Sequence, residues 1–167
     1  IETEYRPRAF GGETLKLLPF QKRILREMFR RKPDGRFQYQ TAVYSCPKKS
    51  GKTELAAAVT YAFGRVFGGE IYSISNDLEG AKNRMFSRVV EALKMLREHD
   101  PITFLKVMPD DKRMRERISL SGIVEFAEAN QVNYGPHVLR YIASDYAGEA
   151  GAMNALVVFD EIWAVAS

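Results

Sequence analysis

The sequence predicts an α/β fold in which a mostly parallel central sheet is flanked by helices. A segment rich in aromatic and β-branched residues at 36–45 leads into a loop and a helix-period apolar pattern, and a strand at 70–75 and a helix at 78–98 repeat this alternation. Two short apolar runs, 138–144 and 155–160, are typical of strands that are buried on both faces. Strands that alternate with helices in this way form parallel sheets.

Composition narrows the class of protein further. The chain has 167 residues, enough for one domain with a hydrophobic core, and its apolar fraction of 46% excludes a disordered chain. No apolar run approaches the ~20 residues of a membrane span and no signal-peptide pattern is present, so we expect no contact with a membrane. The single cysteine, Cys46, excludes an internal disulfide and fits a reducing cytoplasm. A net charge of +4 permits contact with a polyanion without arguing for one.

Residues 1–18 lack periodicity and are predicted to form an extended arm ahead of one domain at 19–167. A helix is expected to begin at Pro19, because proline suits a first helical turn. A turn at 33–35 then leads to the strand at 36–45. The apolar face of the helix is formed by Phe20, Ile24, Leu25, Met28 and Phe29.

Beyond the loop, Gly68-Gly69 ends the second helix and the strand at 70–75 follows. The helix at 78–98 aligns its apolar residues on one face. Residues 117–120 and 123–127 flank Ser121-Gly122 and predict a β-hairpin.

The loop CPKKSGKT, residues 46–53, lies between a predicted strand and a predicted helix, as a phosphate-binding loop does. Such a loop directs backbone N–H groups and a helix N-terminus at an anion. Gly51 would allow close approach of the backbone, Lys52 would place a charge on the outer phosphates, and Thr53 would bind Mg²⁺. The alternative is a chance Gly-Lys-Thr in a strand-to-helix turn, and Cys46 replaces the glycine that opens the usual motif.

The segment ALVVFDE, residues 155–161, would supply the partner of this loop. Its apolar residues predict a buried strand ending at Asp160, and ligands of open parallel sheets bind at the carboxyl ends of the strands. Asp160 would hold Mg²⁺, partly through water, and Glu161 would orient or deprotonate the water that attacks the γ-phosphate. The alternative is a strand end where two acids meet solvent.

Four segments, in this order along the chain, resemble the N-terminal ATPase domain of the large subunit of tailed-phage terminases, the motors that package viral DNA. LKLLPFQKRILREMF resembles the segment ahead of the phosphate loop, and CPKKSGKT resembles a variant loop that often lacks the first glycine. SISNDLEGAKNRMF resembles the strand and helix that follow, although Gly80 stands where many members have glutamine, and VVFDEIWA resembles the acidic pair. The resemblance covers roughly residues 15–167 and implies a P-loop NTPase of the ASCE/RecA-like type.

The resemblance implies ATP and Mg²⁺ as cofactors. The family's adenine-reading glutamine would be Gln21, whose amide could pair with an adenine edge. Lys48 stands where the family usually has arginine, and lysine cannot make a bidentate phosphate contact, so Lys49 is an alternative contributor. Glu161 and Lys52 would be catalytic, and Thr53 and Asp160 would bind the metal. The implied nucleotide-binding residues are Gln21, Pro47, Lys48, Lys49, Ser50, Gly51, Lys52 and Thr53.

The implied partners are double-stranded DNA, a portal protein, a small terminase subunit and further copies of the chain in a ring on the procapsid, in the host cytoplasm. Only six residues follow Glu161, so we expect a fragment that is truncated after the Walker B strand and has no nuclease activity. A neighbouring subunit would donate an arginine to the transition state. The candidates, which could instead contact DNA phosphates, are Arg113, Arg115, Arg117 and Arg140.

Two other functions fit the same residues. Helicase-like and other DNA-remodelling ATPases also place a glutamine ahead of the loop and a DE pair after it. A non-catalytic nucleotide-binding scaffold that assembles with the portal or small subunit is the third hypothesis. The presence of Lys52, Thr53, Asp160 and Glu161 favours an active enzyme.

Overall fold

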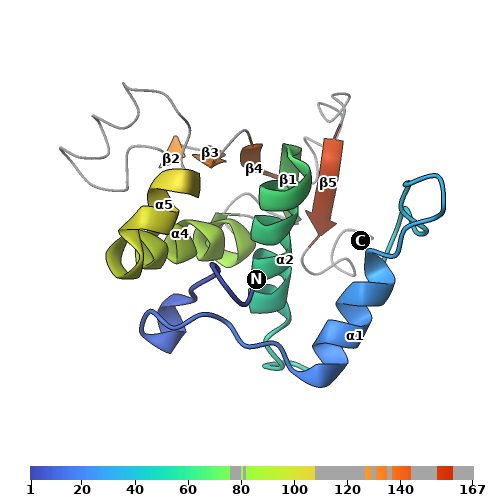
Figure 1. Ribbon diagram of the computed structural model, residues 1–167, viewed down its shortest axis with the longest axis horizontal. Helices are drawn as coiled ribbons and strands as arrows, with labels where there is room; N and C mark the ends of the chain where they lie inside the picture. Colours follow the sequence, from blue (N-terminus) through green and yellow to red (C-terminus); the bar gives the residue numbers. More distant parts are fainter. Residues whose placement is uncertain are drawn as a thin grey trace.

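The computed structural model describes residues 1–75, 80, 82–107, 127–128, 131–134, 137–143 and 154–159 (Figure 1). The helical elements are η1 (Arg8–Phe10), α1 (Pro19–Met28), α2 (Lys52–Phe67), η2 (Lys82–Phe86), α4 (Ser87–His99) and α5 (Pro101–Val107). The strands are β1 (Gly69–Ser75), β2 (Ala127–Glu128), β3 (Gln131–Tyr134), β4 (His137–Ala143) and β5 (Asn154–Phe159). This mixture of helices and strands is compatible with the predicted α/β class.

The five described strands form one sheet in the order β2-β3-β4-β1-β5. Strand β1 pairs in parallel with β4 on one side and with β5 on the other. The pairs β2·β3 and β3·β4 are antiparallel. Two residues separate β3 from β4, which is long enough for a hairpin and too short for a parallel crossover. The sheet is therefore mixed, with three parallel strands at one side.

Several predicted elements are confirmed. Helix α1 begins at Pro19, α2 ends ahead of Gly68, and β1, β4 and β5 lie within a residue or two of the predicted strands. The long helix predicted at 78–98 is found as α4, which continues to His99 and is preceded by a π-helical segment, η2. The short helix α5 was not expected. The hairpin around Ser121-Gly122 lies outside the described residues.

The strand predicted at 36–45 is wrong. In this segment the only β-pairing among the described residues is one isolated bridge between Arg31 and Phe37. Phe37 packs against Phe63 and Phe67 of α2, with ring centroids 6.1 and 5.3 Å apart, which holds the segment against the helix and away from the sheet. Val43 is 77% exposed. Aromatic and β-branched residues favour a strand only where a neighbouring strand accepts their backbone hydrogen bonds.

Strand β5 is also less buried than predicted. Ala155 and Phe159, at its two ends, are exposed, whereas Leu156 and Val158 are half-buried and pack against the core. Among the described strands, β1 is the neighbour of β5, and the other edge of β5 is unpaired. Within the described residues, one face of β5 packs on the core and the other is less covered, so burial on both faces does not apply to it.

The core lies between the sheet and the helices α2 and α4. On one face of the sheet, Ile71 of β1 is opposite Leu139 of β4 and Leu156 of β5. These side chains belong to the same buried cluster as the helix residues that cover them. Phe86 stacks edge-on against Tyr141 with ring centroids 4.7 Å apart. The helix residues that complete the cluster are Ala57, Ala58, Tyr61, Phe63, Met85, Val89, Ala92, Leu93, Leu96, Phe104 and Val107.

Residues 1–18, which were expected to form an extended arm, pack onto the domain. Tyr5 is fully buried and its ring lies 5.7 Å from that of Tyr61 on α2. Glu4 accepts hydrogen bonds from the hydroxyl of Tyr61 at 3.1 Å and from Nε of Arg65 at 3.0 Å. The segment lacks helical or strand periodicity because its contacts come from individual side chains and not from a regular face.

Within the described part of the chain, none of the helices combines the length and the apolar character needed to cross a membrane.

Gly69 provides a test of the packing between β1 and β5. Its φ is +91°, and a Cβ at this position would lie 2.7 Å from Cβ of Ala155. We expect Gly69→Ala to lower the free energy of unfolding by roughly 2–4 kcal/mol, because backbone strain and overpacking add. Gly35→Ala is the matched control: its φ is +82° and a Cβ there meets nothing within 4 Å, so about 1–2 kcal/mol of strain alone remains. Equal losses in urea unfolding would show that the two strands are not in close contact.

Glu4 provides a test of the packing of the N-terminal segment. Burial raises the pKa of Glu4, but the hydrogen bonds from Arg65 and Tyr61 and the charge of Arg65 outweigh it, so that its pKa lies below the ordinary value of 4.5. The resulting stabilisation is present above pH 4.5 and is lost as the pH falls through the lowered pKa. We expect Glu4→Gln to be less stable than the wild type at pH 7 and to lose less stability on acidification. Parallel stability-versus-pH curves for the two proteins would contradict this.

Candidate functional site

The connection between α2 and β1 sets which end of the sheet carries the site. Only Gly68 separates the end of α2 from the start of β1, and its φ of 77° reverses the chain. Helix α2 therefore runs antiparallel to β1, and its N-terminus lies at the end of the sheet where β1 finishes. Strand β5 is parallel to β1 and finishes at the same end (Figure 1). In parallel sheets this carboxyl end is where ligands bind.

The loop at 46–50 turns sharply into α2. Lys49 has a φ of 66° and Gly51 has a φ of 80°, so two residues within three positions adopt the left-handed conformation. Successive residues in right- and left-handed conformations are typical of anion-binding concavities, called nests, in which several backbone N–H groups face the anion. The hydroxyl of Ser50 donates to the carbonyl of Pro47 at 2.7 Å and closes the loop on itself. The residues from Pro47 to Gly51 are all exposed, so their backbone is accessible to a ligand.

A left-handed lysine is itself informative. A residue with a Cβ loses about 1–2 kcal/mol in this conformation, so Lys49 stores strain that Gly51 does not. Residues held in strained conformations cluster at functional sites. Within the loop, the strain at Lys49 and the freedom of Gly51 therefore single out the segment just ahead of α2.

The first turn of α2 carries the two side chains expected to bind phosphate and metal. Lys52 and Thr53 are its first two residues, and both are half-buried. The first N–H groups of a helix have no intrahelical acceptor, and together with the helix dipole they attract an anion. Gly51, the residue before the helix, has no side chain that could cap these groups. The geometry therefore combines an ammonium group, a hydroxyl and an uncapped helix end.

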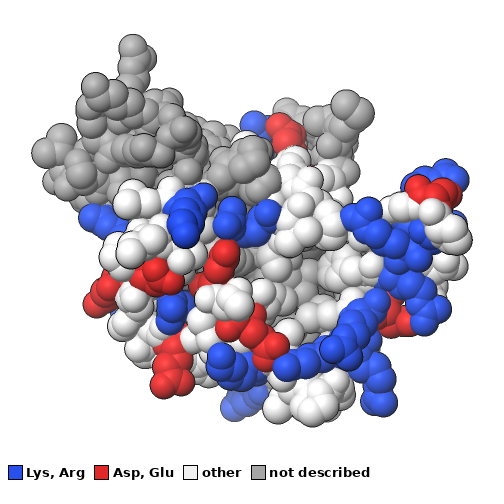
Figure 2. Space-filling view, in the orientation of Figure 1, with Lys and Arg blue, Asp and Glu red and all other residues white. Residues whose placement is uncertain are grey.

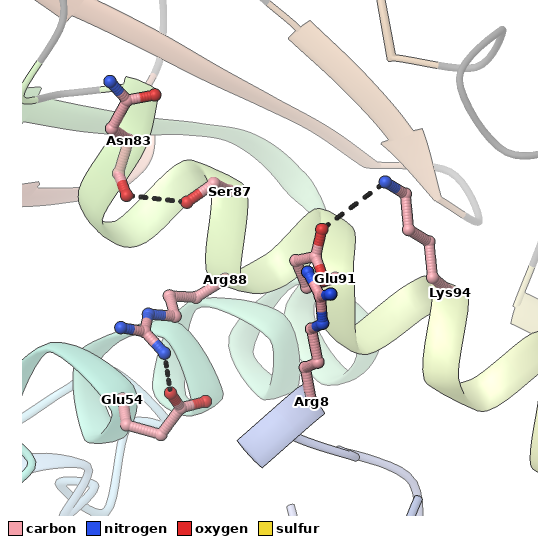
Figure 3. Close-up of polar contacts among 7 residues, drawn as sticks. All are labelled: Arg8, Glu54, Asn83, Ser87, Arg88, Glu91 and Lys94. Carbon is pink, nitrogen blue, oxygen red and sulfur yellow. Dashed lines mark hydrogen bonds and ion pairs between the residues drawn. The ribbon is translucent and has the colours of Figure 1, made fainter. Parts of the chain in front are cut away.

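Glu54, the third residue of α2, ties this turn to the rest of the domain. Its Oε1 accepts a hydrogen bond from the hydroxyl of Tyr5 at 2.6 Å, and its Oε2 lies 3.2 Å from Nη1 of Arg88 on α4. Figure 3 shows Arg88 extending from α4 toward Glu54. Burial, and then the charge of Glu54, raise the pKa of Tyr5, so its hydroxyl stays protonated and donates the hydrogen bond to Glu54. Neither Tyr5, Glu54 nor Arg88 was singled out from the sequence, because no local pattern links three positions so far apart.

A polar hollow of about 300 Å³ lies beside this anchor and is lined by Arg8, Glu54, Asn83, Ser87, Arg88 and Glu91. Its charged side chains pair across it. Nη1 of Arg8 lies 3.3 Å from Oε2 of Glu91, and Nζ of Lys94 lies 3.4 Å from Oε1 of Glu91. Figure 3 shows both basic side chains extending toward Glu91. The hydroxyl of Ser87 donates to the carbonyl of Asn83 at 2.8 Å. Because both acids have basic partners, the hollow carries no excess charge and holds η1, α2 and α4 together.

Gln21 lies in the first turn of α1 and is half-buried. Its Oε1 accepts a hydrogen bond from the backbone N–H of Leu18 at 2.8 Å, which caps the start of the helix. In Figure 1, α1 begins at the same end of the molecule as α2, so Gln21 and the loop share that end. Its amide nitrogen is the group left to donate to a base.

The structure brings together part of the predicted site. The loop, Lys52 and Thr53 meet at the start of α2. Asp160 and Glu161 lie outside the described residues, but β5 ends at Phe159, immediately before them, at the same end of the sheet. Among the described residues, no group of three or more His, Cys, Asp or Glu side chains could hold a metal ion.

Of the four candidate arginines, the structure describes Arg140. Arg113, Arg115 and Arg117 lie outside the described residues. Nη2 of Arg140, on β4, lies 3.8 Å from Oε1 of Glu70, the second residue of β1. This pair is therefore toward the end of β1 opposite to the loop.

A scan against models of protein families finds no match for this chain, and searches of curated proteins and of solved structures find none either. A functional proposal for this chain therefore rests on its own residues.

The anchor on Glu54 can be tested by truncation. Glu54→Ala leaves the buried hydroxyl of Tyr5 without its acceptor and removes the pair with Arg88, so we expect a loss of about 2–3 kcal/mol in the free energy of unfolding. Glu91→Ala is the matched control, because its pairs are at the surface and contribute about 0.5 kcal/mol or less. In the double variant Tyr5→Phe/Glu54→Ala, the loss should be smaller than the sum of the single losses, since no hydroxyl is left unpaired. Additive losses in chemical denaturation would contradict the proposed contact.

Proposed function

We propose that this chain is the ATPase domain of a DNA-packaging motor of the terminase large-subunit type, binding Mg²⁺–ATP at the start of α2. The observation that carries the proposal is that α2 begins at the end of the sheet where β5 finishes. Lys52 and Thr53 open α2 at the end where β5 finishes, one residue before Asp160 and Glu161. A triphosphate with its metal ion needs these opposite charges on either side of it.

The chemistry of each residue follows from this arrangement. The loop N–H groups and the ammonium of Lys52 would bind the β- and γ-phosphates, and the hydroxyl of Thr53 would bind Mg²⁺. Asp160 would complete the metal site, and Glu161 would orient the attacking water. Lys48 and Lys49 are both exposed ahead of the helix, so either could reach the γ-phosphate. Hydrolysis would then depend on positioning and on charge stabilisation more than on covalent chemistry.

Packaging is the favoured use of the ATPase because of the order of four segments in the chain. The glutamine segment that opens α1, the loop without its first glycine, the strand–helix pair and the acidic pair all occur in the order of that family. Double-stranded DNA, a portal protein, a small terminase subunit and other copies of the chain would be its partners, in the cytoplasm of the host. A helicase-like ATPase also places a glutamine ahead of the loop and an acidic pair after it, and a non-catalytic scaffold would not require Lys52, Thr53, Asp160 and Glu161 together.

Nucleotide binding is tested most directly at Lys52. Lys52→Ala removes the charge from the phosphates, and we expect the affinity for a non-hydrolysable ATP analogue with Mg²⁺ to fall roughly 10- to 100-fold, as for the loss of a hydrogen bond to a charged group. Isothermal titration calorimetry measures this. Lys106→Ala is the control, because Lys106 is an exposed lysine on α5, away from the loop.

Unchanged affinity in Lys52→Ala would end the proposal. The variants Lys48→Ala and Lys49→Ala, measured in parallel for ATP hydrolysis, would show which of the two lysines contributes to the γ-phosphate. A wild-type chain that binds the analogue but hydrolyses no ATP, alone or with DNA, would favour the scaffold.

A further inference from the structure

The positive charge of the chain is concentrated in one segment. Residues 16–52 contain eleven Lys and Arg and two Asp and Glu, a net charge of +9, whereas the whole chain carries +4. The rest of the chain is therefore acidic, with a net charge of −5. Figure 2 shows the consequence: Lys and Arg gather over α1 and the turn that follows it, while the face over α4 and α5 mixes both signs.

Helix α1 separates its cations from its apolar residues. At 3.6 residues per turn, Arg23 and Arg26 lie on one side of the helix and Leu25 and Met28 lie on the other. The structure agrees, since the two arginines are exposed and the two apolar residues are half-buried. The end of α1 is attached to the domain through Phe29, whose ring lies 6.1 Å from that of Phe63.

Six exposed cations form what we call the basic surface: Lys16, Arg23, Arg26, Arg30, Lys32 and Arg36. Arg30 pairs with Glu27 and Arg36 pairs with Asp34, both in exposed geometry that contributes little. The other four make no ion pair with an acid among the described residues. Arg31 has a different role: its guanidinium lies 5.0 Å from the rings of both Phe37 and Phe67, and this fixes the turn that carries Lys32 and Arg36.

The dimensions suit a nucleic-acid backbone. From Arg23 to Arg26, both within α1, the helix axis advances about 4.5 Å at 1.5 Å per residue, a little more than the rise of one nucleotide of a single strand at about 3.4 Å. Contacts of this kind bind phosphate without reading the base sequence.

Double-stranded DNA is favoured over a single strand or a membrane. Bases of a single strand could stack on Phe20 and Tyr39, which are 43% and 44% exposed, so the preference for a duplex over a single strand rests on the proposed function. A membrane-bound helix inserts its apolar face, whereas Leu25 and Met28 of α1 are half-buried on the side away from the arginines.

We propose that the basic surface binds the phosphate backbone of double-stranded DNA, independently of the nucleotide loop. The choice of double-stranded DNA as the partner rests on the proposed function. The residues themselves are separate from the loop residues that would bind ATP, so the two sites can fail or succeed independently.

The test measures binding to a labelled duplex of about 30 base pairs by fluorescence anisotropy. The titrations are made without nucleotide, at salt concentrations between about 0.05 and 0.2 M. Arg23→Gln/Arg26→Gln should weaken binding roughly 10- to 100-fold at 0.1 M salt and reduce the slope of log K against log salt by about 2. Arg97→Gln/Lys106→Gln, which removes two charges from α4 and α5, should change affinity by about twofold or less. Arg23→Lys/Arg26→Lys keeps the charge and should keep the slope.

Each variant is checked by thermal unfolding and by binding of the ATP analogue, both of which should be unchanged. Lys52→Ala should bind the ATP analogue more weakly and should bind the duplex with unchanged affinity. Loss of duplex binding in that variant alone would overturn the separation of the two sites. Equal effects of the α1 and α4–α5 variants would overturn the location of the surface. Tighter binding to a single strand, or to anionic vesicles with no binding to the duplex, would overturn the choice of partner.

If the wild type does not bind the duplex at low salt but binds the ATP analogue, the inference fails and the nucleotide site survives. If it binds the duplex through Arg23 and Arg26 but does not bind the analogue, the basic surface stands and the proposed ATPase fails.

Discussion

A single-residue reversal at Gly68 is the constraint on which the candidate site depends. With only one residue between α2 and β1, the helix must run back along the strand, and its N-terminus must lie where the parallel strands end. The φ of 77° at Gly68 and of 91° at Gly69 are conformations that a residue with a Cβ rarely adopts. Two adjacent glycines therefore fix the direction of α2, and that direction brings the loop to the end of β5.

The first turn of α2 has no side-chain cap at Gly51, and contacts of Glu54 hold it in place. Glu54 joins the buried Tyr5 of the N-terminal segment and Arg88 of α4 to this turn. Three segments distant in sequence thus meet within one turn of the loop at 46–50. A loop that holds Lys49 in a left-handed conformation depends on such fixed surroundings, since strain persists only where neighbouring contacts outweigh it.

Charge and packing divide the molecule into two parts. The segment from Lys16 to Lys52 is strongly basic and contributes few buried residues, whereas α2, α4 and the sheet form the core. No residue of α1 is fully buried. A peripheral helix that is held at its end by aromatic contacts can present arginines to solvent at low cost, because they are not desolvated. The core sets the position of the loop at 46–50, and the basic segment contributes a positive electrostatic potential around it.

The sequence by itself determined the elements whose signals are local. Proline at the start of α1, the glycine pair after α2 and the apolar runs of β1, β4 and β5 were all found where they were predicted, because each depends on backbone geometry or on periodicity within a few residues. The sequence also predicted that a helix follows Gly51, and α2 begins at Lys52.

Only the tertiary structure decided the features that depend on distant partners. The segment at 36–45 has the composition of a strand, but Phe37 packs on α2, and no strand in the described part of the chain pairs with the segment. The N-terminal segment has no periodicity, yet Tyr5 is fully buried because Tyr61 and Glu54 surround its ring and hydroxyl. Propensity and periodicity describe what a segment can form alone, whereas pairing and burial depend on what the rest of the chain places beside it.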